Sequence, residues 1–176
     1  MTGERLQQVL EERARLLARP AVDHAGEDVV ELVVLTVGAE RYGIDVRLVR
    51  EVRPLAGLAP VPGTPGVWAG LVNLRGSLCP VLSLRHYLQV AAPGGEAVAA
   101  GPGVLVVVTV PFPAALLVDA AAEVRRCRPD ELRPVQAAAG DRAHMAVTAV
   151  SADLLQVLDP AAVLADPALM VGHEAG

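Results

Sequence analysis

The sequence predicts a mostly β protein with short helices, built from small barrels and not from a parallel α/β sheet. Short runs of β-branched and apolar residues recur along the chain, and turn-forming residues separate them about every ten positions. The length of 176 residues suits one ordinary domain, or two small lobes that share a core. Hydrophobic residues make up 53% of the chain but aromatic residues only 2%, so we expect a core of Val, Leu, Ala and Ile.

Residues 1–28 are predicted to form a helix followed by a linker. The apolar residues of segment 3–19 fall on one stripe of a helix, which Thr2 can cap and Pro20 ends. A helix of this length is marginal by itself, so it should dock either on its own domain or on a partner, and both remain open. The apolar stripe consists of Leu6, Val9, Leu10, Leu16 and Leu17.

Between residues 29 and 55 the pattern predicts extended segments joined by short turns. Ala39-Glu40 supplies the first turn, and Asp45 can cap a helical turn that follows. In chain order the predicted elements are the strand Val29–Val37, the strand Arg41–Asp45, the helical turn Val46–Val49 and the extended segment Arg50–Leu55.

A short helix is predicted over residues 64–70. Thr64 offers a capping hydroxyl, and Pro65 suits the first position of a helix because it needs no N–H partner there. Gly70 stands where a helix often ends in a glycine. Thr64, Pro65 and Gly70 are therefore predicted to have structural roles in a cap or turn.

A tight hairpin should follow, because two apolar runs flank the turn Leu74-Arg75-Gly76-Ser77. Gly76 and Asn73 can both adopt the positive φ that hairpin turns commonly need, which gives Gly76 a structural role and presents Arg75 at an exposed tip. Pro80 cannot donate a hydrogen bond to a neighbouring strand, so it places its strand at a sheet edge or a bulge. The two paired strands are predicted to be Leu71–Asn73 and Leu78–Leu84.

Beyond residue 90 the sequence predicts two more strand pairs and two short helices. Loops rich in Gly, Ala and Pro occupy residues 91–103 and 134–143. Asp159-Pro160 and Asp166-Pro167 each combine a capping carboxylate with a proline at the first helical position. Residues 166–176 then form a short C-terminal helix and tail. The strand pairs are Val104–Val110 with Ala115–Val118, and Met145–Val150 with Leu154–Leu158 about the turn Ser151-Ala152-Asp153.

Composition argues against nucleic-acid and membrane functions. The net charge is −5, whereas a nucleic-acid surface needs clustered cations. The one basic cluster (Arg125, Arg126 and Arg128) is interpreted as a solvated turn. The uncharged stretch 97–118 is interrupted by Gly and Pro, which favours buried strands over a membrane-spanning helix. The N-terminus lacks the apolar region of a signal peptide, so we predict a cytoplasmic protein without direct membrane insertion.

No group of residues suggests catalysis. The histidines lack paired-ligand spacing, and no serine stands in a GxSxG motif. Asp119, Glu123 and Asp130 could share a face, but solvated or capping roles are favoured. Cys79 and Cys127 form no CxxC pair, and Cys79 is expected to be buried within a strand. We therefore predict no enzyme activity, no catalytic residue, no cofactor and no metal site.

The chain resembles the CheW-like family of chemotaxis coupling proteins from about Val29 to Leu164, and residues 29–165 are assigned to that domain. The resemblance rests on an ordered series of short motifs at matching spacing. It implies two five-stranded β-barrel lobes that share a core, with no catalysis. The motifs are Tyr42-Gly43-Ile44-Asp45, Val49-Arg50-Glu51-Val52, Thr64-Pro65, Gly70-Leu71-Val72-Asn73-Leu74-Arg75-Gly76 and Pro80-Val81-Leu82-Ser83-Leu84-Arg85, with weaker points at Leu117-Val118-Asp119 and Leu158-Asp159.

The resemblance also implies partners and partner-binding residues. Family members hold the cytoplasmic tips of chemoreceptors together with a CheA-type histidine kinase, which carries a related regulatory domain. The positions carried over to this chain are Arg75, Glu51, Val49 and Asn73. An Arg on a tight turn can make bidentate or stacked contacts at little ordering cost. The alternative for Arg75 is a structural ion pair with a neighbouring carboxylate such as Glu51.

The chain departs from the family pattern at several points. Ser83 replaces an Asp that usually precedes Leu-Arg, and the turn at Ser151 lacks a glycine. Ala115, Ala146 and Thr148 replace glycines of the later hairpins, so their turns are expected to differ in shape.

Three functional hypotheses remain open at this stage. The first is an adaptor that couples chemoreceptors to a CheA-type kinase. The second is an accessory CheW-like protein that binds only the receptor or only the kinase in a motility or pilus-type pathway. The third is a small-molecule-binding domain, for which a deep polar-lined pocket would be the evidence.

Overall fold

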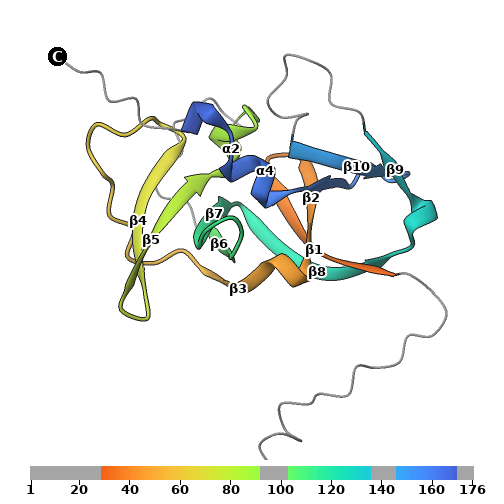
Figure 1. Cartoon of the computed structure of the whole chain (residues 1–176), viewed down its shortest axis with the longest axis horizontal. Coiled ribbons are helices and arrows are strands. Elements are labelled where there is room, and N and C mark those ends of the chain that lie inside the picture. Colours follow the sequence, from red (N-terminus) through yellow and green to blue (C-terminus); the bar gives the residue numbers. More distant parts are fainter. Residues whose placement is uncertain (1–28, 92–102, 136–145, 170–176) are drawn as a thin grey trace, which may run out of the picture.

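The computed structural model describes residues 29–91, 103–135 and 146–169, and these form two β-sheets with short helical segments (Figure 1). The predicted helix at 3–19 and most of the predicted loops at 91–103 and 134–143 lie outside the described residues. The mostly β architecture and the two lobes predicted from the sequence are confirmed.

Lobe 1 contains the six-stranded sheet, whose strand order is β8-β1-β2-β11-β10-β9. Neighbouring strands are antiparallel except for β2 and β11, which pair in parallel. Relative to the expected five strands, this sheet has a short additional edge strand, β9. The strands are β1 (Val30–Val37), β2 (Glu40–Asp45), β8 (Ala120–Cys127), β9 (Leu132–Pro134), β10 (Val147–Ser151) and β11 (Gln156–Leu158).

Lobe 2 contains the five-stranded sheet, with strand order β3-β6-β7-β5-β4. Its only parallel pair is β5 with β7, and its edges are β3 and β4. The strands are β3 (Val49–Pro54), β4 (Trp68–Leu74), β5 (Ser77–Ser83), β6 (Val104–Val108) and β7 (Ala114–Val118). The helical segments are η1 (Val46–Leu48), α2 (Leu84–Tyr87), η2 (Pro129–Glu131), α4 (Pro160–Leu164) and η3 (Pro167–Leu169).

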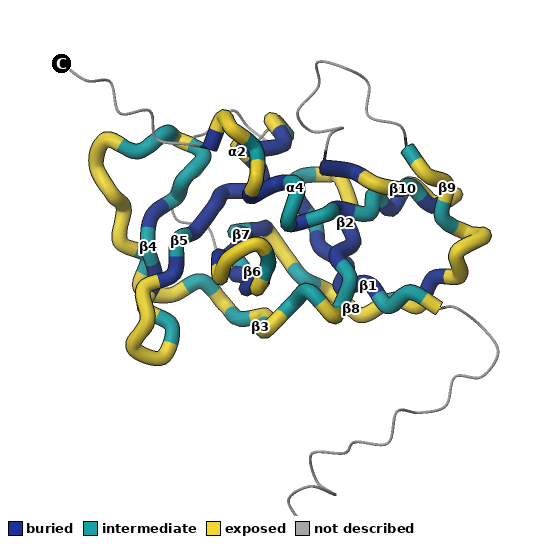
Figure 2. Tube along the Cα trace, in the orientation of Figure 1, coloured by how far each residue is buried: buried dark blue, intermediate teal, exposed yellow. Residues whose placement is uncertain are grey.

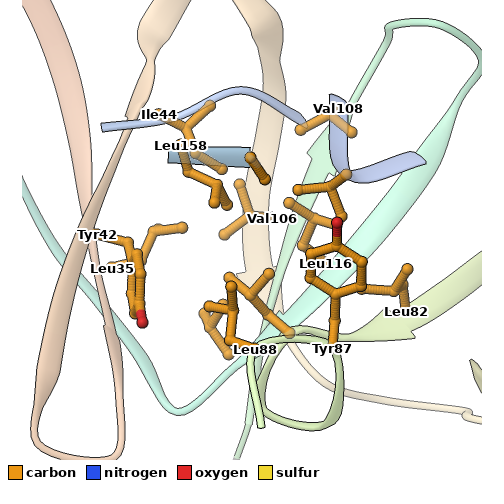
Figure 3. Close-up of a cluster of buried hydrophobic side chains, with 14 of the residues drawn as sticks. Leu35, Tyr42, Ile44, Leu82, Tyr87, Leu88, Val106, Val108, Leu116 and Leu158 are labelled. Carbon is orange, nitrogen blue, oxygen red and sulfur yellow. The ribbon is translucent and has the colours of Figure 1, made fainter. Parts of the chain in front are cut away.

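Several strands are buried on both faces, which explains their continuous apolar sequences. In β6, Val106 and Val108 belong to a cluster shared by both lobes, whereas Leu105 and Val107 belong to the interior of lobe 2. The side chains of β1 alternate in the same way. Odd-numbered positions such as Leu35 belong to the shared cluster, and even-numbered positions such as Leu32 belong to the interior of lobe 1. The shared core thus lies between the sheets, where much of the chain is buried (Figure 2), and side chains from both lobes meet there (Figure 3).

The chain crosses between the lobes twice within the described residues. It leaves lobe 1 after β2 through η1, builds all of lobe 2, and returns through Asp119 between β7 and β8. Asp45 caps η1 as predicted, because its Oδ1 accepts a hydrogen bond from the Arg47 N–H at 2.8 Å. The predicted caps at Asp159 and Asp166 are also confirmed, at the starts of α4 and η3.

The predicted helix over residues 64–70 is wrong. The Trp68 N–H donates to the Pro65 carbonyl in a turn, and the chain enters strand β4 at Trp68. Thr64 Oγ1 donates to the Val61 carbonyl at 2.8 Å, so Thr64 and Pro65 shape a turn, not a helix start. Gly70 lies inside β4 at a register irregularity. Pairing with β5 outweighs the local capping signal.

Three further expectations are corrected. Strand β5 is an interior strand, and Pro80 is accommodated because pairing with β7 begins only at Val81. The basic cluster was expected in a turn, but Arg125 and Arg126 lie in strand β8. Arg126 forms an ion pair with Glu31 of β1. Ala115 lies within β7, where extended backbone accepts any side chain.

Thr148 similarly lies within β10, so the replacement of a family glycine causes no strain there. The turn at Ser151 behaves differently, because Leu154 adopts a φ of 63° in the left-handed region. The absence of a glycine therefore makes the backbone conformation of this one turn less favourable in free energy.

Candidate functional site

The turn between β4 and β5 places Arg75 in a backbone conformation that L-residues seldom adopt. Arg75 has a φ of 54° and Gly76 a φ of 89°, and Leu74 pairs with Ser77 across them. Two consecutive positive φ angles match a two-residue hairpin turn, whose hand fits the twist of the strands. Asn73 does not take one of them, contrary to the prediction. Its Oδ1 instead accepts a hydrogen bond from the Gly76 N–H at 2.8 Å.

An ion pair connects this turn to strand β3 at the opposite edge of the same sheet. Arg75 Nη2 lies 2.9 Å from Glu51 Oε2. The Arg75 side chain is 73% exposed and that of Glu51 is 21% exposed, so the guanidinium keeps most of its surface free for other contacts. The structural ion pair considered for Arg75 is therefore present, and it holds an exposed side chain in place instead of burying it.

Strand β3 alternates strictly between half-buried and exposed residues. Val49 and Glu51 face inward, and Val49 packs against the shared core. Val52 points outward with other exposed residues of the strand. Of the four predicted residues, the structure thus brings Arg75 and Glu51 into contact, gives Asn73 a role in the turn, and places Val49 mainly in packing.

Two exposed apolar residues near this site in the chain were not predicted from the sequence. Leu78 is 71% exposed and lies directly opposite Asn73 in the hairpin, while Val52 follows Glu51 in β3 and faces the other side of that strand. The sequence pattern predicted neither residue to be exposed. We call the set formed by Glu51, Val52, Asn73, Arg75 and Leu78 the hairpin surface.

Gly70 supports the hairpin through a close backbone approach. Ala59 and Leu71 exchange two backbone hydrogen bonds of 2.8 Å, which cover part of the free edge of β4. Gly70 has a φ of 145°, and a Cβ on it would overlap the carbonyl oxygen of Ala59. Both the conformation and the available space therefore require glycine here.

Several charges away from the hairpin surface serve local structure. The Arg47 guanidinium holds the pKa of Asp45 below its usual range, and Arg125 does the same for Asp153. Burial raises the pKa of the Cys79 thiol. Within ranges 29–91, 103–135 and 146–169, no three His, Cys, Asp or Glu residues gather as metal ligands would. No helix in these ranges has the length and apolarity to span a membrane.

The family model of the CheW-like domain matches residues 31–168, which is most of the chain. The chain belongs to the CheW-like family. The two-lobed fold is therefore that of a CheW-like domain, the hairpin turn with Arg75 lies within the matched residues, and the resemblance drawn from the motifs is confirmed.

Curated relatives agree with this assignment. The chain is 40% identical over 62 residues to the chemotaxis protein CheW of Klebsiella aerogenes, covering 35% of this chain and 37% of that protein. It is 35% identical over 63 residues to CheW of Treponema pallidum, again covering 37% of that protein. The chain thus spans little more than a third of the length of these two relatives. For CheW of Rhizobium meliloti, identity is 27% over 113 residues, covering 63% of this chain and 70% of the relative.

A solved structure shares the fold. The scaffolding protein TtCheW of Thermoanaerobacter tengcongensis superposes with a TM-score of 0.68, covering 80% of this chain and 90% of that one, at 23% sequence identity. This similarity extends over both sheets of the CheW-like domain and confirms the fold class predicted from the sequence.

Proposed function

We propose that this CheW-like protein is a cytoplasmic, non-enzymatic adaptor that binds the cytoplasmic tip of a chemoreceptor and the regulatory domain of a CheA-type histidine kinase. Membership in the CheW-like family and the names of the curated relatives support a role in chemotaxis-type signalling. The hairpin surface is the proposed site of receptor or kinase contact.

The conformation of Arg75 is the single observation that carries this proposal. The left-handed region costs a non-glycine residue about 1–2 kcal/mol, and Asn or Gly would occupy this turn position at lower cost. The ion pair with Glu51 recovers little of this cost, because exposed pairs contribute about 0.2–1 kcal/mol. An exposed residue held in an unfavourable backbone conformation suggests a role in binding, and Arg is enriched among the residues that contribute most to binding energy at protein interfaces.

The exposed apolar residues of the hairpin surface fit the same role. Leu78 adds exposed apolar area directly after the turn that carries Arg75, and Val52 adds exposed apolar area on β3, on the opposite face from Glu51. Binding residues on a fixed hairpin lose little entropy when a partner docks. Individual contacts can be weak in a receptor array, because many copies raise the effective concentration.

The test measures binding of the purified protein to an isolated receptor tip and, separately, to the kinase regulatory domain. We expect both to bind, and Arg75→Asn to weaken at least one of them. Arg47→Asn is the matched control, because Arg47 is another exposed arginine in an ion pair, with Asp45. If wild-type protein binds neither partner, the adaptor function is refuted. Binding to one partner alone would support the accessory, single-partner protein instead.

A further inference from the structure

A nearly buried arginine lies at the boundary between the lobes, away from the hairpin surface. Arg85 is in α2, directly after β5 of lobe 2, and its side chain is only 10% exposed. Its Nη1 donates to the Ala91 carbonyl at 2.9 Å, and its Nη2 donates to Asp119 Oδ2. A buried guanidinium needs such partners because desolvation of an unpaired charge is costly.

Asp119 stands where the chain returns from lobe 2 to lobe 1, and it contacts both lobes. Its Oδ2 accepts from Arg85 of lobe 2 and also from the Gly38 N–H, at 2.6 Å, in the β1–β2 turn of lobe 1. Its own N–H donates to the Thr36 carbonyl of β1 at 3.1 Å. One carboxylate oxygen therefore receives hydrogen bonds from both lobes.

The β1–β2 turn also approaches the chain after α2 as closely as its backbone allows. Gly38 has a φ of 62°, and a Cβ there would lie 2.8 Å from Val90 Cγ1 and 3.5 Å from the nearest Arg85 nitrogen. A Cβ at this position would require either the Val90 side chain or the turn to move, and the positive φ also favours glycine. The contact between Arg85, Asp119 and Gly38 is thus sterically as well as electrostatically defined.

Apolar side chains make up much of the remaining contact between the lobes, together with a hydrogen bond of 3.0 Å from Trp68 Nε1 of β4 to the Leu169 carbonyl of η3. The shared core contains side chains from both sheets, such as Leu35 of β1 and Leu116 of β7 (Figure 3). Apolar burial holds two bodies together but is non-directional, so it fixes their angle less sharply than hydrogen bonds do. Charge-assisted hydrogen bonds have a narrow range of favourable geometry.

We propose that Arg85, Asp119, Gly38 and the Ala91 carbonyl form an interlobe latch that fixes the angle between the two lobes. Arg85 and Asp119 are then positioning residues: they touch no partner, but they set how the surfaces of lobe 1 and lobe 2 face the two partners together. The part of this inference that concerns partners rests on the proposed adaptor function, whereas the part that concerns the lobe angle does not.

The lobe angle is tested on the isolated protein by electron paramagnetic resonance. Spin labels are attached to cysteines introduced at Leu78 in lobe 2 and Leu154 in lobe 1, which are both highly exposed. Cys79 and Cys127 are buried and do not compete for the label. We expect a narrow distance distribution in the otherwise wild-type protein and a broadened, shifted one in Arg85→Met and Asp119→Ala.

Arg126→Met is the matched control, since it removes one cation and one ion pair, with Glu31, inside lobe 1 and outside the labelled turns. Its distribution should equal that of the wild type. If Arg85→Met does not fold, as judged by circular dichroism, Asp119→Ala still gives the answer, because the Asp119 side chain is 40% exposed and Ala removes the oxygen that accepts from both lobes. A folded Asp119→Ala protein with the wild-type distribution would overturn the latch.

Partner assembly is then measured with Arg85→Met and Asp119→Ala in the chain without the introduced cysteines, because Leu78 belongs to the hairpin surface. We expect the affinity of each variant for each partner alone to stay within about twofold of the wild-type value. The amount of complex that contains both partners at once should fall about tenfold or more. A changed lobe angle with unchanged assembly would refute the positioning role. Failure of wild-type protein to bind any partner would refute the adaptor function, and the distance distributions would still decide whether the latch exists.

Discussion

Replacing Arg75 by Asn should separate the stability of the hairpin turn from its function. In the structure Arg75 has a φ of 54°, and its guanidinium contacts Glu51 at 2.9 Å. Asn tolerates the left-handed region, so Arg75→Asn should recover up to about 1 kcal/mol of backbone cost. The lost exposed ion pair costs about 0.2–1 kcal/mol. The free energy of unfolding should therefore stay within about 1 kcal/mol of the wild-type value.

Partner binding should respond far more strongly than stability. An arginine at the centre of an interface commonly contributes about 2 kcal/mol or more, which corresponds to roughly a 30-fold loss of affinity. Urea denaturation gives the free energy of unfolding, and isothermal titration calorimetry with the receptor tip and the kinase domain gives the affinities. Arg47→Asn should change neither affinity by more than about twofold.

Two results would refute this reasoning. If Arg75→Asn lowers the free energy of unfolding by clearly more than about 1 kcal/mol, the contact with Glu51 is structural and the argument from backbone cost fails. If stability and both affinities are unchanged, Arg75 is exposed without contacting a partner. Glu51→Gln distinguishes these cases, because it removes the ion pair and leaves the guanidinium in place.

Three further predictions concern the fold. Gly70→Ala should lower the free energy of unfolding by at least about 2 kcal/mol, because the new Cβ overlaps backbone atoms of Ala59. A variant that unfolds at the same urea concentration as the wild type would contradict the close contact between Gly70 and Ala59. Leu154→Asn should raise the free energy of unfolding by about 0.5–1 kcal/mol, because it relieves a φ of 63° on a leucine that is 75% exposed; a lower thermal midpoint would show that the leucine has a packing role. Burial raises the thiol pKa of Cys79 and Cys127, so at about pH 8 each holds less thiolate than a free thiol, and alkylation should be slow in native protein and fast in urea by mass spectrometry; rapid native labelling would contradict their burial.

Elements that depend on local pattern could be predicted from the sequence. The sequence predicted a strand at β1 and a buried strand at β6, and in the structure both faces of each strand pack against a core. Caps such as Asp159 lie next to the helix they start, so a few residues define them. The hairpin around Arg75 was also local, since two strands and a two-residue turn specify it.

Features set by distant residues could not be predicted in the same way. The cap-like sequence from Thr64 to Gly70 suggested a helix, but pairing with β5 and with Ala59 determined the structure. Pro80 suggested an edge strand because the parallel partner β7, which starts beyond it, follows much later in the chain. Local propensity is a weak guide wherever tertiary pairing competes with it.

The candidate site shows the same division. Arg75 was predicted because it stands on a recognisable turn, whereas Leu78 was predicted only as the first residue of an apolar strand. The interlobe latch was not foreseen, because Asp119 is 34 residues from Arg85 and 81 from Gly38. A lone carboxylate in sequence gives no indication of the charges that it meets after folding.

The two-lobed architecture limits where a partner can bind. Strands such as β1 and β6 have no free face, because one side serves the shared core and the other serves a lobe interior. Ala59 covers part of the edge of β4, so the tight turns and the edge strand β3 remain as rigid exposed features of lobe 2. Arg75 and Glu51 join these two features. A partner that binds at the ion pair therefore contacts both the hairpin and the edge strand β3. Such binding requires that the fold around the ion pair is intact.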